Sequence, residues 1–220
     1  MESVSEQVAI LGKFIDHVEQ ENAIGAAAIE TLFTNARTTH EFLDRPIPDA
    51  LLKRLVEIAE LGPTGGNSSP MRLVFVRSAE AKQRLLPAMW APNASKMLAS
   101  PITAIIATDA RFFEHFEFLF PTRVEAMRAI YNNGDAVDFT HAEAFRNSTL
   151  QAAYLIIAAR AAGLACGPMS GFEPARVDAA FFPDGRFKTN FLMNLGYAAQ
   201  RTALPPRLPR FSFSDVARIE

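Results

Sequence analysis

The sequence of 220 residues has few of the features that mark a specialised class of protein. It holds a single cysteine, Cys166, so no disulfide can form within the chain and a reducing compartment is favoured. It has neither a G-x-G-x-x-G fingerprint nor a P-loop, which argues against an ordinary Rossmann dehydrogenase and against an NTPase. The four histidines lie far apart without an H-E-x-x-H pattern, so no metal site is expected.

Charge and hydropathy argue against further classes. The formal net charge is −2 at pH 7 and like charges do not cluster, so a nucleic-acid partner is not expected. The most apolar run stops at Arg160 and is too short for a membrane span, which needs roughly 20 apolar residues. The N-terminus starts acidic and lacks the basic and apolar regions of a signal peptide. We therefore expect a cytoplasmic protein without a membrane partner.

What the chain does have is enough apolar sequence for a substantial core. Hydrophobic residues make up 49% of the chain and charged residues 21%. Residues 150–164 are apolar almost all round, which predicts a central helix buried in the core or against a partner chain, with Gly163 at its end. The turn at 167–172 (GPMSGF) follows, and its glycines allow backbone amides to approach a flat or anionic ligand.

Apolar runs and helical periodicities alternate along the rest of the chain. We expect strands at 73–76, 102–107 and 190–196, and helices at 50–61, 78–89, 93–98 and after Pro174. This order predicts helices on both sides of a sheet, in an α/β or α+β arrangement. Residues 1–22 predict an N-terminal helical extension. The phenylalanine-rich segment at about 110–140 indicates an inserted helical lid or, alternatively, a helix that packs at a dimer interface.

Four separate loops carry polar groups that together suit a phosphorylated, flat cofactor. Arginine offers a bidentate fork to phosphate oxygens, and hydroxyl and amide groups suit a polyol. Each loop alone is a weak signal, because an arginine in a loop is more often a solvated surface residue. The residues are Arg37, Thr38 and Thr39, then 67–70, then Asn93 with Lys96, and finally Arg207.

From about residue 29 to residue 213, these motifs resemble the nitroreductase family of FMN-dependent oxidoreductases. The segment 37–39 (RTT) resembles the family's Arg-x-Ser/Thr loop, 63–71 (PTGGNSSPM) its Pro-Ser-x-x-Asn-x-Gln-Pro-Trp loop, and 168–172 (PMSGF) its Pro-x-x-Gly-Phe turn. Asn93 and Lys96 match its Asn-x-x-Lys pair, and Arg207 matches its closing basic residue. The chain departs from the pattern at Ser69 and Met71, and it has His40 or Glu41 in place of a second basic residue in the first loop.

The resemblance implies an α+β fold, a three-layer sandwich with a mainly antiparallel central sheet. Residues 23–220 would form the FMN-binding domain of an intertwined homodimer with FMN at the interface, and residues 63–65 would reach the flavin of the partner subunit. The residues implied to bind FMN are Arg37, Thr38, Thr39, Pro63, Thr64, Gly65, Asn67, Ser69, Asn93, Lys96, Pro168, Met169, Ser170, Gly171 and Arg207.

The same resemblance implies a ping-pong reaction in which NADH or NADPH reduces FMN at N5 and an acceptor then reoxidises it. The flavin carries the chemistry, so we assign no catalytic residue. The runs FRNSTLQAAYLI and GPMSGF are most similar to the malonic semialdehyde reductase branch of pyrimidine degradation, which forms 3-hydroxypropionate. Arg72, Arg123 and Arg146 are candidates to bind that substrate's carboxylate, with structural ion pairs as the alternative. A broad nitroarene or quinone reductase and a flavin-storing or flavin-sensing protein remain alternatives.

Overall fold

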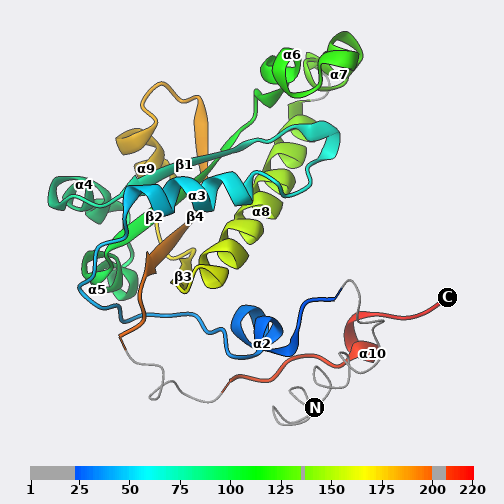
Figure 1. Ribbon diagram of the computed structural model, residues 1–220. Coiled ribbons are helices and arrows are strands. Elements are labelled where there is room, and N and C mark those ends of the chain that lie inside the picture. Colours follow the sequence, from blue (N-terminus) through cyan, green and yellow to red (C-terminus); the bar gives the residue numbers. More distant parts are fainter. Residues whose placement is uncertain (1–22, 135–136, 200–206) are drawn as a thin grey trace. The chain divides into compact units, whose positions relative to one another are not determined.

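The computed structural model describes residues 23–134, 137–199 and 207–220 (Figure 1). The chain divides into two compact units, one formed by Arg37–Ala199 and the other by Met1–Ala36 with Gln200–Glu220. The helix expected within residues 1–22 lies outside the described residues. Among the described helices, none is long and apolar enough to cross a membrane.

The larger unit is built on a four-stranded antiparallel sheet. Its strands are β1 (Met71–Val76), β2 (Ile102–Asp109), β3 (Ala165–Met169) and β4 (Phe187–Gly196), in the order β1-β2-β4-β3. Strands were expected at the positions of β1, β2 and β4, whereas β3 was expected to be part of a turn. That expectation was wrong because Pro168, which has no N–H to donate, is tolerated in an edge strand.

Helices and short helical turns connect the strands. Those of the larger unit are α3 (Asp49–Ala59), η3 (Gly65–Asn67), α4 (Ala79–Leu85), η4 (Leu86–Ala88), α5 (Ala91–Ala99), η5 (Phe112–His115), α6 (Phe116–Leu119), η6 (Pro121–Arg123), α7 (Val124–Tyr131), α8 (Val137–Ala161) and α9 (Pro174–Phe181). The smaller unit has α2 (Ala26–Ile29), the π-helical turn η2 (Glu30–Thr34) and α10 (Phe213–Val216).

The central helix α8 is longer than its apolar run predicted. It begins at Val137 rather than near residue 150, because its first half mixes polar and apolar residues and gives no continuous apolar signal. Gly163 follows its end with a φ of +78°, the left-handed conformation that its sequence position indicated.

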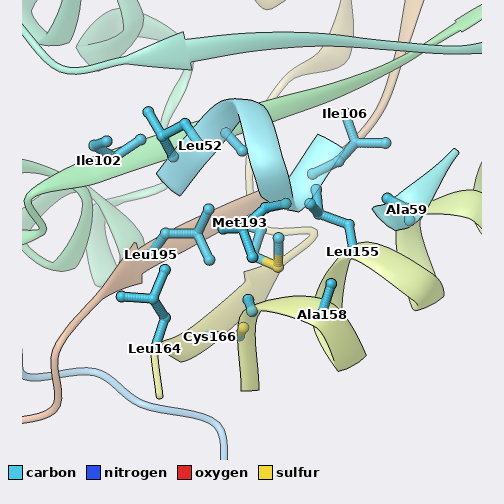
Figure 2. Packing of buried hydrophobic residues seen from close by; sticks show 14 of the residues in the cluster. Leu52, Ala59, Ile102, Ile106, Leu155, Ala158, Leu164, Cys166, Met193 and Leu195 are labelled. Atoms are coloured by element: carbon cyan, nitrogen blue, oxygen red, sulfur yellow. The ribbon is translucent and has the colours of Figure 1, made fainter. Parts of the chain in front are cut away.

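Side chains along each strand point alternately to the two faces of the sheet, and a hydrophobic core lies on each face. Ile102, Ala104 and Ile106 of β2 face α3 and α8, and Figure 2 shows residues of this cluster. Ile105 and Ala107 point the other way and pack with residues of α4, α5 and α9. The expected α+β fold, with helices flanking a mainly antiparallel sheet, is confirmed.

The segment between β2 and α8 has a small aromatic core of its own. The rings of Phe112 and Tyr131 meet edge to face with centroids 4.8 Å apart, and Phe116, Met127 and Ala144 complete the cluster. Since Ala144 belongs to α8, this segment packs on the first half of that helix. Its role as a lid stays a prediction.

Candidate functional site

Residues 37–39 lie along the edge strand β3. The Thr39 amide donates a hydrogen bond of 2.9 Å to the Cys166 carbonyl, and Thr38 forms a parallel bridge with Cys166. A Cβ on Gly167 would lie 2.5 Å from the Thr39 carbonyl oxygen, so only glycine permits this close approach. The first polar loop therefore lies against the strand that leads into the turn at 168–171.

Asn93, near the start of α5, holds that turn from the other side. Its Nδ2 donates to the Gly171 carbonyl oxygen at 3.2 Å, and the Trp90 amide donates to the same oxygen at 3.1 Å. A Cβ on Gly171 would collide with the Asn93 amide. The space that a side chain would need at Gly167 or Gly171 is thus occupied by protein atoms, and packing between the loops accounts for both glycines.

The turn at 168–171 presents backbone donors at the surface. Pro168 and Ser170 are exposed and Met169 is buried. Among the backbone hydrogen bonds of the described residues, none is donated by the amide of Ser170 or of Gly171. Two neighbouring N–H groups are therefore available to an acceptor group on a ligand.

Lys96 brings a positive charge close to the first loop. Partial burial, and then the nearby Lys96 ammonium, lowers the pKa of His40, while Glu41 acts in the opposite direction. His40 directly follows Thr39, so the charge of Lys96 on α5 acts on the first loop. The structure thus brings together residues 37–40, Asn93 with Lys96, and the turn at 168–171.

The second polar loop, residues 63–70, is held by α6 and α8 instead. The Gly65 amide donates to Asn147 Oδ1 at 2.8 Å, and Asn67 Nδ2 donates to the Leu119 carbonyl at 2.7 Å. Asn67 and Ser69 adopt positive φ values of 52° and 38°. Such a conformation costs about 1 to 2 kcal/mol for residues other than glycine, so contacts with the rest of the fold must maintain it.

The predicted cofactor residues therefore fall into two groups at opposite edges of the sheet. The loop 63–70 leads into β1, whereas the first loop and the turn at 168–171 adjoin β3. β2 and β4 lie between these edges, and three strand spacings amount to roughly 14 Å.

Two of the three candidate substrate arginines already take part in ion pairs. Arg72 Nη2 lies 3.2 Å from an oxygen of the buried Asp109, and Arg146 pairs with Glu143 one turn earlier on α8. Arg123 is exposed in η6. A substrate carboxylate would have to compete with Asp109 or Glu143, and the role of all three arginines stays a prediction.

Arg207 lies in the smaller unit. Its Nη2 donates to the carbonyls of Thr34 and Ala36, at 2.9 and 2.8 Å, and more weakly to that of Phe33 at 3.4 Å. These bonds tie residue 207 to the end of the π-helical turn. The proposed contact of Arg207 with the FMN phosphate stays a prediction.

Cys166 is a core residue rather than a nucleophile. It belongs to the cluster that packs α3 and α8 on the sheet. Burial raises the pKa of its thiol to about 11, against a smaller opposing effect of Arg160. The thiolate that a nucleophile requires is therefore scarce at neutral pH.

Sequence reasoning missed the polar side chains of α8 that hold the loop 63–70. Gln151 appeared only as an interruption of an apolar run, and Asn147 and Glu143 were not singled out. Their common spacing of four residues places them on one side of a helix, and this periodicity was the available signal.

Comparison with known proteins identifies the family of the chain. A model of the nitroreductase family matches residues 34–197. A Burkholderia lata protein, provisionally named as an NADH dehydrogenase/NAD(P)H nitroreductase, is 50% identical over 194 residues, which cover 88% of this chain and 97% of that relative. A Stenotrophomonas maltophilia protein with the same kind of name is 49% identical over 199 residues, which cover 90% of this chain and 98% of the relative. The chain belongs to the nitroreductase family.

Solved structures share its fold. A crystal structure of an Exiguobacterium sibiricum protein, provisionally described as a nitroreductase and in complex with FMN, aligns with a TM-score of 0.78 at 20% identity and covers 90% of this chain and 99% of that one. A Bacillus subtilis protein described in the same way aligns with a TM-score of 0.79 at 23% identity, over 89% of this chain and 100% of the other.

Proposed function

We propose that this chain is an NAD(P)H oxidoreductase that carries FMN. The observation that carries the proposal is the exposed turn at 168–171, whose Ser170 and Gly171 amides donate no backbone hydrogen bond within the described part of the chain; Asn93 holds this turn, and the first loop lies along the strand that leads into it. When bound, FMN supplies an acceptor for hydride from a nicotinamide and a donor of hydride to a second substrate. The single, buried Cys166 supports the cytoplasm as the compartment.

The residues present fit such a cofactor. The Ser170 and Gly171 amides suit a ring nitrogen or carbonyl, the Lys96 ammonium suits an electron-rich ring edge, and Arg37 with the hydroxyls of Thr38 and Thr39 suits the ribityl phosphate. In the second loop, Ser68 Oγ is buried and has no hydrogen-bond partner in the part of the chain that the structure describes. A buried hydroxyl of this kind is completed by a further group, such as a bound ligand.

We further propose that two copies form each cofactor site. The two groups of predicted residues lie at opposite edges of one sheet, and in a homodimer the loop 63–70 of one copy can join the β3 edge of the other. Apolar side chains that α8 leaves exposed support this arrangement: Leu150 and Tyr154, one turn apart on the helix, are 45 and 44% exposed, and Phe145 is 54% exposed. Apolar side chains on a long helix are typical of an interface between subunits.

For the second substrate we propose malonic semialdehyde, based on the sequence similarity to that branch of the family. A specific observation favours an aromatic acceptor as the second candidate. Phe118 is 86% exposed on α6, and the next residue, Leu119, accepts the hydrogen bond from Asn67 of the second loop. An exposed ring beside a cofactor loop could stack on a nitroarene or a quinone.

Anaerobic reduction and reoxidation of the purified protein test both levels of the proposal. We expect a yellow protein whose flavin bleaches with NADH or NADPH and recovers its colour when malonic semialdehyde is added. Recovery only with nitroarenes or quinones would leave the oxidoreductase in place and replace the substrate. A protein that takes up FMN but is not bleached by either nicotinamide would be a flavin-binding protein, and one that takes up no FMN would contradict the proposal.

A further inference from the structure

Three polar residues of α8 form a ladder beside the loop 63–70. Glu143, Asn147 and Gln151 follow one another at intervals of four residues and so lie on one side of the helix. Asn147 Nδ2 donates to the Glu143 carbonyl at 2.8 Å and to its carboxylate at 3.3 Å, which leaves Asn147 Oδ1 to accept from the Gly65 amide. The orientation of the Asn147 amide is thereby fixed from both ends.

Gln151 holds the other end of the loop. Its Nε2 donates to Ser69 Oγ at 2.8 Å and to Glu60 Oε1 at 3.0 Å, and its Oε1 accepts from the Met71 amide at 2.9 Å. The Ser69 hydroxyl also donates a hydrogen bond to Glu60 Oε2. One side chain thus links the end of α3, the loop and the first residue of β1.

The burial of Gln151 makes these bonds significant. Its relative exposure is 0%, and its buried neighbours on α8 are Asn147 and Ser148 on one side and Ala152 and Leu155 on the other. A glutamine in such a position is unfavourable unless its amide is fully hydrogen-bonded, and a leucine would pack there without that requirement. The hydrogen bonds of Gln151 to the loop, rather than packing in the core, therefore account for a glutamine at this position.

What it holds is a backbone in an unfavourable conformation. Gly66, Asn67 and Ser69 all have positive φ, at 60°, 52° and 38°. Three hydrogen bonds lie within the loop: from the Asn67 amide to the Thr64 carbonyl at 3.0 Å, from the Ser68 amide to the Gly65 carbonyl at 3.2 Å, and from the Ser69 amide to Thr64 Oγ1 at 3.2 Å. The bonds from Asn147 and Gln151 fix the two ends of the segment that contains all three residues.

We propose that Asn147 and Gln151 are positioning residues, which fix the loop 63–70 in the conformation that binds the flavin. This inference rests on the function proposed above. Asn147 and Gln151 are 4 and 0% exposed, and they act on the loop through Gly65 and Ser69. The family pattern has a glutamine where this chain has Ser69, and here Gln151 supplies an amide to that position from α8.

Replacement of Gln151 by leucine tests the proposal, because leucine fills the space without the hydrogen bonds. We expect Gln151→Leu and Asn147→Leu to weaken FMN binding by the reconstituted apoprotein by about tenfold or more. Leu155→Ala is the matched control, since it removes buried volume one turn further along α8 at a residue of the α3–α8 core. It should lower the unfolding temperature and leave the dissociation constant for FMN within about twofold.

Gln151→Glu adds a readout that a purely structural role would not change. A carboxylate beside Glu60 repels it, whereas the protonated acid can donate to Ser69 or Glu60 as the amide does. FMN affinity of this variant should therefore recover as the pH falls, with little change for the wild type over the same range. If Gln151→Leu bound FMN with wild-type affinity, or if Leu155→Ala lost as much FMN affinity as Gln151→Leu, the positioning role would be wrong and the proposed function would stand. If the wild-type chain took up no FMN, both the proposed function and this inference would be wrong.

Discussion

His40 is the residue at which this chain departs most informatively from the family pattern. It stands in or next to the position of a basic residue, yet partial burial and the Lys96 ammonium lower its pKa, so it is a weaker base than an ordinary histidine. A lowered pKa means that the folded state binds the proton less readily than the unfolded state. The contribution of His40 to stability is therefore complete above its ordinary pKa of about 6.5 and is lost as the pH falls through that value towards the lower folded pKa.

The influence of Lys96 on His40 can be measured directly. We expect Lys96→Met to raise the pKa of His40, because it removes the second cause of the shift, and Glu41→Gln to lower it further, because it removes the opposing charge. An NMR titration of the imidazole protons, assigned with His40→Gln, follows both changes. The same His40 pKa in wild type and Lys96→Met would show that α5 does not approach the first loop.

Among the elements, the strands and helices with a regular apolar pattern were the ones that the sequence could predict. β1, β2 and β4 and the helix after Pro174 were found because short apolar runs and a proline at the first helical position are local signals. β3 was missed for two reasons. Its recognition depends on pairing with β4, which follows it in the sequence only after the helix α9, and the residues Gly167 and Pro168 locally indicate a turn. The first half of α8 was missed because the burial of Asn147 and Ser148 depends on contacts that only the fold creates.

Asp109 joins three elements at one end of the sheet. Its side chain is fully buried at the end of β2 and accepts from Arg186 Nε at 3.0 Å and Nη2 at 2.9 Å, just before β4. Arg186 Nη1 also reaches Glu114 of η5 at 2.6 Å. Hydrogen bonding to Asp109 raises the pKa of Arg186, which is the direction expected for a cation held by a carboxylate.

Loss of the Asp109 carboxylate should lower the stability of the fold. We expect Asp109→Asn to reduce the free energy of unfolding by about 3 kcal/mol, because the mostly buried cation of Arg186 loses the more buried of its two carboxylate partners and Arg72 loses its ion pair. Glu114→Gln serves as the control and should cost less than about 1 kcal/mol, since the Glu114 side chain is 43% exposed. Urea unfolding measures both, and equal losses in the two variants would contradict the special position of Asp109.

At the scale of the whole molecule, the sequence predicted a set of cofactor loops but not their separation. The predicted cofactor-binding segments are 37–39, 63–70, 93–96 and 168–171. Their order along the chain does not indicate that β1 and β3 are the two edges of the sheet. Strand order depends on long-range pairing, which no local pattern encodes. The separation is what makes a second copy necessary in the proposed site.

The exposed apolar side chains of α8 provide the test of that second copy. We expect Leu150→Arg to convert a dimer into a monomer at micromolar concentration and to weaken FMN retention, because a charge would be buried at the interface and the partner's loop would be lost. Leu43→Arg is the control, since Leu43 is also 45% exposed but lies outside α8. Sedimentation velocity distinguishes the two states, and a wild-type monomer or a dimeric Leu150→Arg would contradict the proposed assembly.

The state of Cys166 has a practical consequence for spectroscopy. With a thiol pKa of about 11 and a buried side chain, the native cysteine of this chain is a poor target for maleimide or methanethiosulfonate reagents at neutral pH. A cysteine introduced at an exposed position can therefore be spin-labelled without first removing Cys166. Distances between the labels on two copies would then report how the subunits are arranged, in solution and with the native core intact.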